Sequence, residues 1–273
     1  MSDIVLTSGV RANLLQLQKT AALITDTQTK LATGKRVNSA LDNPINYFTA
    51  QGLTNRASDL GNLLDSMSSG INTIQAANNG ITSITKLVQS AQALASQAQQ
   101  TNDTTVRAGL ASQFNAILGQ IDQLSGDSSF NGINLLHSTT SANLTVTLNE
   151  SGSSAVTINA VDFTSAGLTL NNSSNNWATT ADIGLASTDL TNALTSLRSQ
   201  AQAFGSNLST VQIRQDFTKA MINTLQTGSD SLTLADSNEE GANLLALQTR
   251  QQLSTTALSL ASQASQAVLK LFQ

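Results

Sequence analysis

The chain has 273 residues, of which 13 are basic and 17 acidic, so its formal net charge is −4. This balance argues against a nucleic-acid binder, because neutralising phosphates takes clustered lysines and arginines. Only 11% of the residues are charged, well below the roughly 25% of an average globular protein. A subunit packed among copies of itself tolerates such a surface, since burying a small polar group costs less than burying an ion. A monomer with a weakly charged exterior fits the composition equally well.

The sequence lacks the features of a disulfide-linked protein, of a membrane protein and of one with a secretory signal. It contains no cysteine, and therefore neither a disulfide framework nor a thiolate site. No apolar run approaches the ~20 residues of a membrane-spanning helix, so we expect no membrane insertion. The first residues lack the basic and apolar regions of a secretory signal. An extracellular location would therefore require export without a cleaved signal peptide.

The first predicted helix carries a narrow apolar stripe of the coiled-coil kind. Gly34 is expected to end this helix in a left-handed conformation. Residues 35–43 then form a connector, because the residue before Pro44 is disfavoured in a helix and Pro44 itself suits the first turn of the next one. The stripe is spaced by four and three residues with one missed position at Gln28: Val10, Leu14, Leu17, Ala21, Ile24 and Leu31.

Residues 44–100 are predicted to form a long second helix, because the same apolar spacing continues through them. Four glycines interrupt it, and each costs about 1 kcal/mol relative to alanine. Either close approach of a neighbouring helix or ordinary sequence drift accounts for them. A third helix is expected from the turn at 102–105 to about Gly126. The four glycines are Gly52, Gly61, Gly70 and Gly80.

The middle of the chain changes character. Residues 144–148 and 156–158 alternate apolar and polar side chains across a glycine-containing turn, which predicts a β-hairpin. One further short strand is expected at 168–170. Helix resumes by about Thr188, and a last helix follows a break near 236, with Ser237 or Asn238 as its cap. Its stripe keeps the four-three spacing if Gln251, Ser254 and Ser265 count as polar members: Leu244, Leu247, Leu258, Ala261, Val268 and Phe272.

These elements predict a mainly α fold, a long coiled-coil-like helical hairpin or bundle built from both chain ends, with a small β-hairpin insertion in the middle. The simplest closure pairs the first helix with the last. Their stripes are thin, so the pair would bury too little apolar area to offset an ordering cost of roughly 1–2 kcal/mol per residue. We therefore expect both ends to be poorly ordered in a free monomer and to fold when neighbours pack around them.

No constellation of residues predicts catalysis, a metal site or a cofactor. His137 is the single histidine of a chain without cysteine, which argues against a zinc site. Thr33-Gly34-Lys35 is similar to the end of a phosphate-binding loop, but Thr29 stands where that loop requires a glycine. We expect no catalytic residue, no cofactor and no enzyme activity.

Four segments, in order, resemble bacterial flagellin. Residues 31–44 are similar to the N-terminal signature of the family, and residues 129–136 resemble the Phe-Asn-Gly turn after its third helix. Residues 204–217 resemble a later helix in looser form, and residues 261–272 are close to the family's C-terminus. Residues 88–94 contain neither arginine nor glutamate, as in alphaproteobacterial flagellins. The signature positions are Gly34, Arg36, Asn38, Asp42, Pro44, Phe130, Asn131 and Gly132.

The resemblance implies a structural subunit that polymerises helically into the flagellar filament for swimming motility. Residues 1–44 and 236–273 would pair as its core, 45–130 and 182–235 would form a helical body, and 131–181 a small outer insertion. Implied partners are further copies of the chain, an export chaperone, and the hook-associated and cap proteins, with an extracellular location. The implied polymerisation interface is Val10, Leu14, Leu17, Ile24, Leu31, Leu244, Leu247, Leu258, Val268, Leu271 and Phe272.

Two alternatives share much of this pattern. A hook–filament junction protein has a similar N-terminus, but it would be a minor component of sheared filaments. A cell-surface adhesin or binding module could be built on the same helices. That module would need an exposed aromatic or charged site, and the middle of the chain offers Trp177 and few acids.

Overall fold

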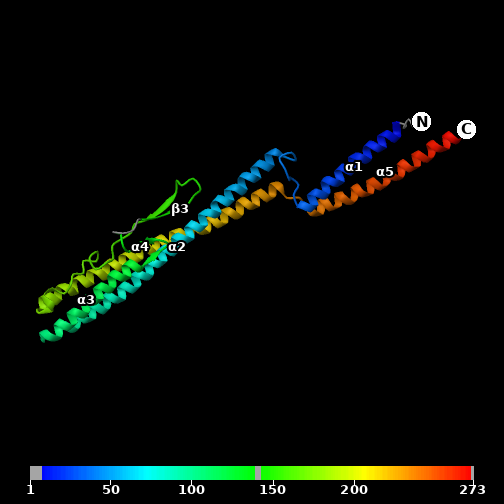
Figure 1. Ribbon diagram of the computed structural model, residues 1–273. Helices are drawn as coiled ribbons and strands as arrows, with labels where there is room; N and C mark the ends of the chain where they lie inside the picture. The colour runs from blue at the N-terminus through cyan, green and yellow to red at the C-terminus, as the bar shows by residue number, and fades with distance from the viewer. Residues whose placement is uncertain (1–7, 139–142, 272–273) are drawn as a thin grey trace. The chain divides into compact units, whose positions relative to one another are not determined.

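The computed structural model describes residues 8–138 and 143–271, except for the side chains at positions 265 and 268–271. The chain divides into two compact units. We call residues 1–55 with 224–273 the terminal unit, and residues 56–223 the body unit. Within the described ranges, the fold is mainly helical with a small β insertion, as the sequence predicts (Figure 1). The long helices are α1 (Ser8–Thr33), α2 (Pro44–Gln99), α3 (Thr104–Asp127), α4 (Thr180–Thr233) and α5 (Ser237–Leu271).

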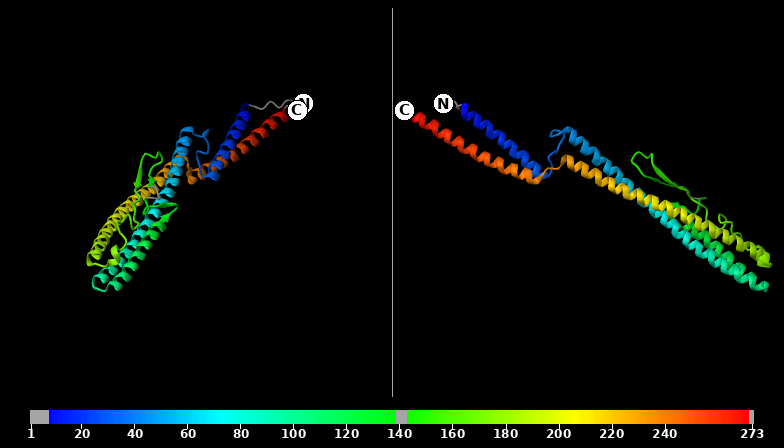
Figure 2. Two further views of the ribbon diagram at one scale, coloured as in Figure 1. Left: turned by 60° about the vertical axis from the view of Figure 1, so that its left-hand side comes forward. Right: turned by 180° about the vertical axis from the view of Figure 1, so that it is seen from behind.

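In the terminal unit, α1 and α5 lie side by side and run antiparallel (Figures 1 and 2). The first turns of α2 and the last turns of α4 belong to the same unit. They approach closely through small side chains, since the Ser229 hydroxyl donates to the Ala50 carbonyl and lies 3.0 Å from the Thr54 hydroxyl. Helix α5 begins after Asp236, whose carboxylate accepts from the amides of Asn238 and Glu239. The cap is therefore Asp236, rather than Ser237 or Asn238.

In the body unit, α3 and the adjoining parts of α2 and α4 pack around one apolar core. Asp103 caps α3, because its carboxylate accepts from the amides of Thr105 and Val106. Helix α4 begins at Thr180 instead of near Thr188. Thr179 and Asp182 form a reciprocal capping box at that point, which starts the helix two turns before its regular apolar stripe.

The β insertion contains two separate hairpins (Figure 1). Strands β3 (Leu144–Thr147) and β4 (Ala155–Ile158) pair antiparallel, which confirms the predicted hairpin. Strands β1 (Ser129–Phe130) and β2 (Ile133–Asn134) form a much shorter pair. The short strand expected at 168–170 is a turn. The amides of Leu168 and Leu170 donate to carbonyls four and five residues earlier, so they are not available to a neighbouring strand. A one-turn 3-10 helix, η1 (Ser174–Trp177), leads to α4.

Two of the four glycines in α2 allow the β insertion to pack closely against the helix. A Cβ atom at Gly70 would lie 2.6 Å from the Val146 side chain, and one at Gly80 would meet Ser128 and Leu136. Nothing lies within 4 Å of the corresponding positions at Gly52 and Gly61. Close approach therefore explains Gly70 and Gly80, although their neighbours are the β insertion and the Ser128 cap of α3, and not another helix.

No helix among the described residues combines the length and the hydropathy needed to cross a membrane.

Candidate assembly surfaces

The row of α1 that is covered within the α1–α5 pair is half polar. The covered positions follow a four-three spacing: Val10, Asn13, Leu17, Thr20, Ile24, Thr27 and Leu31. The sequence pattern correctly includes Val10, Leu17, Ile24 and Leu31, and its further member Ala21 is also half-buried. It includes the exposed Leu14 and misses Asn13, Thr20 and Thr27. Leu14 is 38% exposed, whereas Thr20 is fully buried. Burial costs Thr20 little, because its hydroxyl donates to the Gln16 carbonyl within the same helix.

The covered row of α5 keeps the predicted positions. Leu244, Leu247 and Leu258 are half-buried, and the polar members Gln251 and Ser254 lie among them in the same row. Val268 and Leu271 belong to α5, but their side chains lie outside the described part of the chain, and so does Phe272. We call the two covered rows together the α1–α5 seam. Threonine, serine and glutamine occupy many of its layers, so the seam buries less apolar area than a leucine-rich coiled coil.

Large apolar side chains also lie on the sides of both helices that face away from the seam. On α1, Leu15 is exposed on the far side from the seam, whereas Leu23 lies at the edge of the seam and lines the cavity between the two helices. On α5 the spacing is eight and then seven residues, which keeps the side chains on one face. An exposed apolar line of this kind is a candidate protein contact surface. The outward leucines of α5 are Leu245, Leu253 and Leu260.

Charged side chains gather where the C-terminal end of α1, with Asp26 and Lys30, lies beside the start of α5, with Glu240. Lys30 donates to the Asp26 carboxylate over 2.9 Å. This hydrogen bond, helped by the nearby charges of Glu240 and Asp42, raises the pKa of Lys30. A cavity between the two helices is lined by Lys30, Glu240 and Arg250 together with apolar neighbours. These three charged groups and Asp26, which also lines the cavity, therefore lie close together along one part of the seam.

The signature residues of the connector hold α1 to the end of α4. Gly34 has a φ of +67°, as predicted for a left-handed cap. Its carbonyl accepts from the Ala235 amide, while the Arg36 amide donates to the Thr233 carbonyl. The Arg36 guanidinium also donates to the carbonyls of Ser231 and Leu232. These carbonyls end α4 and lack helical partners, so Arg36 caps the helix with a positive charge, which suits the dipole.

Asp42 closes the rest of the connector. Its carboxylate accepts from the amides of Ser39 and Asn38 over 2.8 and 2.9 Å. These bonds favour the charged form and lower the pKa of Asp42. Asn38 donates to the Lys35 carbonyl, and Asn43 caps α2, which starts at Pro44. Just beyond, Leu41, Ile45 and Phe48 are exposed, although all three are large and apolar.

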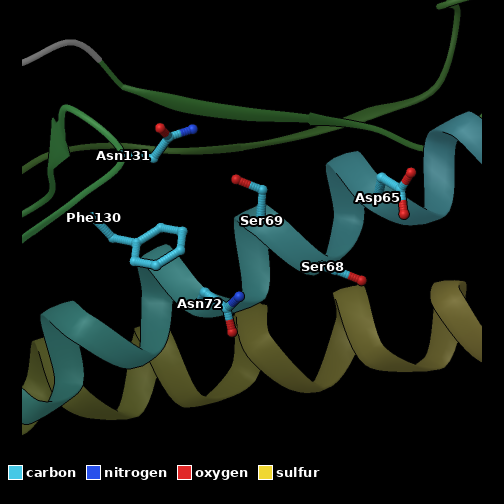
Figure 3. Close-up of a pocket in the computed structure, with 6 residues that line it drawn as sticks. All are labelled: Asp65, Ser68, Ser69, Asn72, Phe130 and Asn131. Carbon is cyan, nitrogen blue, oxygen red and sulfur yellow. The ribbon is translucent and has the colours of Figure 1, made fainter.

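The Phe130-Asn131-Gly132 signature forms the turn of the short β1–β2 hairpin. Asn131 and Gly132 both have positive φ, 51° and 80°, as a two-residue type I′ turn requires. Phe130 is 37% exposed at the edge of a shallow groove of about 440 Å³ (Figure 3). Asp65, Ser68, Ser69 and Asn72 of α2 line the groove with Phe130 and Asn131.

Arg107 is a structural residue that the sequence pattern did not indicate. It is buried at the start of α3. Its guanidinium donates to the carbonyls of Ala98, Thr101 and Ala178, and so joins the α2–α3 turn to the beginning of α4. A buried arginine paired only with neutral acceptors has no periodic signal in a sequence, which explains why it was missed.

The described residues contain no cluster of three or more side chains that could hold a metal ion. His137 is half-buried in the β insertion and pairs through its backbone with Asp162. The notable features of these surfaces are therefore apolar lines, a polar seam and helix-capping contacts.

Comparison with known proteins identifies the family to which the chain belongs. Residues 8–142 match the bacterial flagellin N-terminal helical region, and residues 187–272 match the bacterial flagellin C-terminal helical region. Flagellin FljM of Caulobacter vibrioides is 33% identical over 97% of both chains. The flagellin of Brucella melitensis is 26% identical over the full length of both. The crystal structure of Bacillus cereus flagellin covers 55% of this chain and 86% of its own, with 21% identity and a TM-score of 0.49. The chain belongs to the bacterial flagellin family, the structural subunits of the flagellar filament.

Proposed function

We propose that this chain polymerises through its terminal unit, in which the α1–α5 pair forms the inner core of the filament. The observation that carries the proposal is the distribution of leucines on that pair. The seam is partly polar, whereas outward faces of both helices carry leucines such as Leu15 and Leu253, which are 55% and 68% exposed. A pair that is apolar on its outside is suited to burial among other pairs. A heterologous contact that does not close then generates a helix of subunits.

The predicted interface residues take two roles in this proposal. Leu17, Ile24, Leu31, Leu244, Leu247 and Leu258 hold α1 against α5 within one copy, and the outward leucines contact neighbouring copies. Leu14 lies at the edge of the seam and belongs to both sets. The pair by itself is marginal, because polar layers contribute little against the ordering cost of roughly 1–2 kcal/mol per residue. We infer that α1 and α5 become fully ordered only when neighbours cover them.

The remaining expectations follow from family membership. We infer that the chain is exported unfolded, without a cleaved signal peptide, with the help of an export chaperone. We also infer that it meets hook-associated proteins at the base of the filament and a cap protein at its tip. The signature residues Arg36 and Asp42 shape the connector and take no part in chemistry, so we expect no enzyme activity.

Seeded elongation tests the proposal. Purified protein is added to short sheared filaments, and the products are examined by electron microscopy. The parent chain should extend the seeds into uniform helical filaments. Binding to seed ends without growth would contradict the proposal and favour a junction protein.

A matched pair of variants tests the leucine face. Leu253→Glu places a charge on the outward face of α5 and should abolish elongation, because an ion would be buried between copies. Gln252→Glu adds the same charge at the adjacent exposed position and should elongate more nearly like the parent. Trp177 lies in the body unit, so an unchanged fluorescence spectrum would show that both variants fold there. Normal growth of Leu253→Glu would refute the assignment of this face.

A further inference from the structure

A second unpartnered apolar surface lies in the body unit, on α4. Ile213 and Phe217 are one helical turn apart, and they are 65% and 56% exposed. Gln215 lies between them in sequence and donates to the Ser68 hydroxyl of α2 over 2.8 Å. Successive residues are about 100° apart around a helix, so Ile213 and Phe217 project about 160° away from Gln215 on either side. We call these two residues the knob; it faces away from α2.

The groove beside Phe130 is an open depression with an exposed aromatic edge, and it is therefore suited to receive the apolar knob. The groove lies on α2 and the β1–β2 turn, whereas the knob projects from the side of α4 opposite Gln215, which bonds to α2. The knob and the groove are therefore on different faces of the same unit. Phe130 supplies an exposed aromatic surface at the edge of the groove, and the side chains of α2 leave an open depression next to it. Two aromatic rings and one aliphatic side chain would be removed from water if the knob entered this groove.

The charges of the two surfaces are complementary. Arg214 follows Ile213 directly, and no hydrogen bond or ion pair engages its side chain within the described residues. The nearby Lys219 is paired with Asp216. In the groove, the Asp65 carboxylate is likewise unpaired within the described ranges. The chain has no Lys or Arg between Arg107 and Arg198, so the insertion supplies no cation of its own to Asp65.

We propose that the knob of one copy docks in the Phe130 groove of another copy, with Arg214 facing Asp65. The contact is heterologous, because the two surfaces differ and lie on different faces of each copy, and it therefore propagates without closing. This inference rests on the proposed function and adds a contact between body units to the one between terminal units.

Cross-linking within filaments tests the contact directly, because the chain contains no cysteine. One variant carries Phe217→Cys and another carries Asn72→Cys. Co-assembled filaments of the two should give covalent dimers with a short bis-maleimide, and filaments of either alone should not. A chain that carries both substitutions should give a ladder of multimers. Gln202→Cys replaces Phe217→Cys in the control; it lies on the same side of α4, about 22 Å along the helix, and should give no dimer with Asn72→Cys.

A charge exchange tests the pairing of Arg214 with Asp65. Arg214→Glu and Asp65→Arg should each slow seeded elongation by about tenfold, since like charges would then face each other. The double variant should recover most of the parent rate. Circular dichroism of the monomers shows whether any variant has lost its helices. The double variant carries both changes, so its recovery could not come from a variant that fails to fold.

The outcomes separate this inference from the proposed function. Filaments that form normally but give no dimer, or as much dimer with Gln202→Cys, overturn the knob-and-groove contact alone. A double variant as slow as the single ones also overturns it. A parent chain that never elongates seeds overturns the proposed function first.

Discussion

The terminal unit and the body unit bury different kinds of side chain. Within the described residues, the buried apolar side chains of the terminal unit are Val37, Ala50 and Leu225, while Thr20, Thr27, Ser229 and Thr233 are buried polar ones. The body unit buries a continuous core that includes Met67, Ile84, Phe114 and Trp177, each at most 1% exposed. Because burial of apolar area is the main stabilising contribution, we expect the body unit to fold by itself and the terminal unit to depend on what surrounds it.

This contrast suits a subunit that must remain soluble before it polymerises. A stable body keeps its shape as a monomer. If the terminal pair is marginal, as we propose, the ordering of α1 and α5 is coupled to assembly, and binding and folding occur together. The outward leucines then contribute only in the polymer.

The largest expected effect is in the core of the body unit. Phe114→Ala should lower its free energy of unfolding by about 3–5 kcal/mol, because it removes a buried ring that packs 4.9 Å from the ring of Trp177. Denaturant titration followed by Trp177 fluorescence measures this, since Trp177 is the single tryptophan. A loss below about 1 kcal/mol would show that the body core is not tightly packed.

The next largest effect concerns the close contact of α2 with the β insertion at Gly80. Gly80→Ala should destabilise the body unit by about 1–3 kcal/mol, because the new methyl group would meet Ser128 and Leu136. Gly119→Ala is the control, since nothing lies within 4 Å of that position, and it should stabilise α3 by about 1 kcal/mol. Equal effects of the two substitutions in the same titration would contradict the close approach.

In contrast to these destabilising changes, an apolar substitution in the α1–α5 seam should raise the stability of the pair. Thr20→Val replaces a buried hydroxyl with a methyl group of similar size and should stabilise the α1–α5 pair by about 1 kcal/mol. Helicity of the dilute monomer, measured by circular dichroism, should rise. Thr25→Val is the matched control, because the Thr25 hydroxyl makes the same kind of bond to Ala21 but is exposed. A rise of equal size in both variants would indicate helix propensity and not the seam.

The smallest effect is the pH dependence of the connector. The folded state lowers the pKa of Asp42 through the amides of Ser39 and Asn38. Its contribution to stability is therefore present above the ordinary aspartate pKa of about 4 and is lost as the pH falls through the lower folded value. Asp42→Asn should remove the pH dependence of the Ser39 and Asn38 amide signals in NMR spectra between pH 5 and pH 2, roughly. An unchanged titration of those signals would assign it to another carboxyl.

The sequence predicted the helices, the β3–β4 hairpin and the covered row of α5, because these have regular apolar spacing. It misplaced part of the α1 row, since it included the apolar but exposed Leu14 and left out the covered polar residues Asn13 and Thr20. A threonine whose hydroxyl bonds within its own helix, such as Thr20, can be buried at little cost. A pattern based on hydropathy does not recognise it. The start of α4 and the turn at 168–170 depend on local hydrogen bonds of Thr179, Asp182 and Leu168, which leave no periodic trace.

Less of the candidate surfaces than of the fold could be predicted from the sequence. The signature residues Gly34, Asp42 and Gly132 follow from turn chemistry that can be read in a sequence. The roles of Arg36 and Arg107 as partners of distant helix-end carbonyls depend on the tertiary fold. The knob of Ile213 and Phe217 was also missed, because only the packing shows that this side of α4 is uncovered.

The central claim is that the terminal unit is marginal alone and ordered in the polymer, while the body unit is stable in both. Amide hydrogen exchange of the dilute monomer and of assembled filaments, compared segment by segment, tests it most directly. We expect α1 and α5 to exchange rapidly in the monomer and to be strongly protected in filaments, with the α2 and α3 segments of the body protected in both. Equal protection of α1 and α5 in the dilute monomer and in the filament would contradict the account.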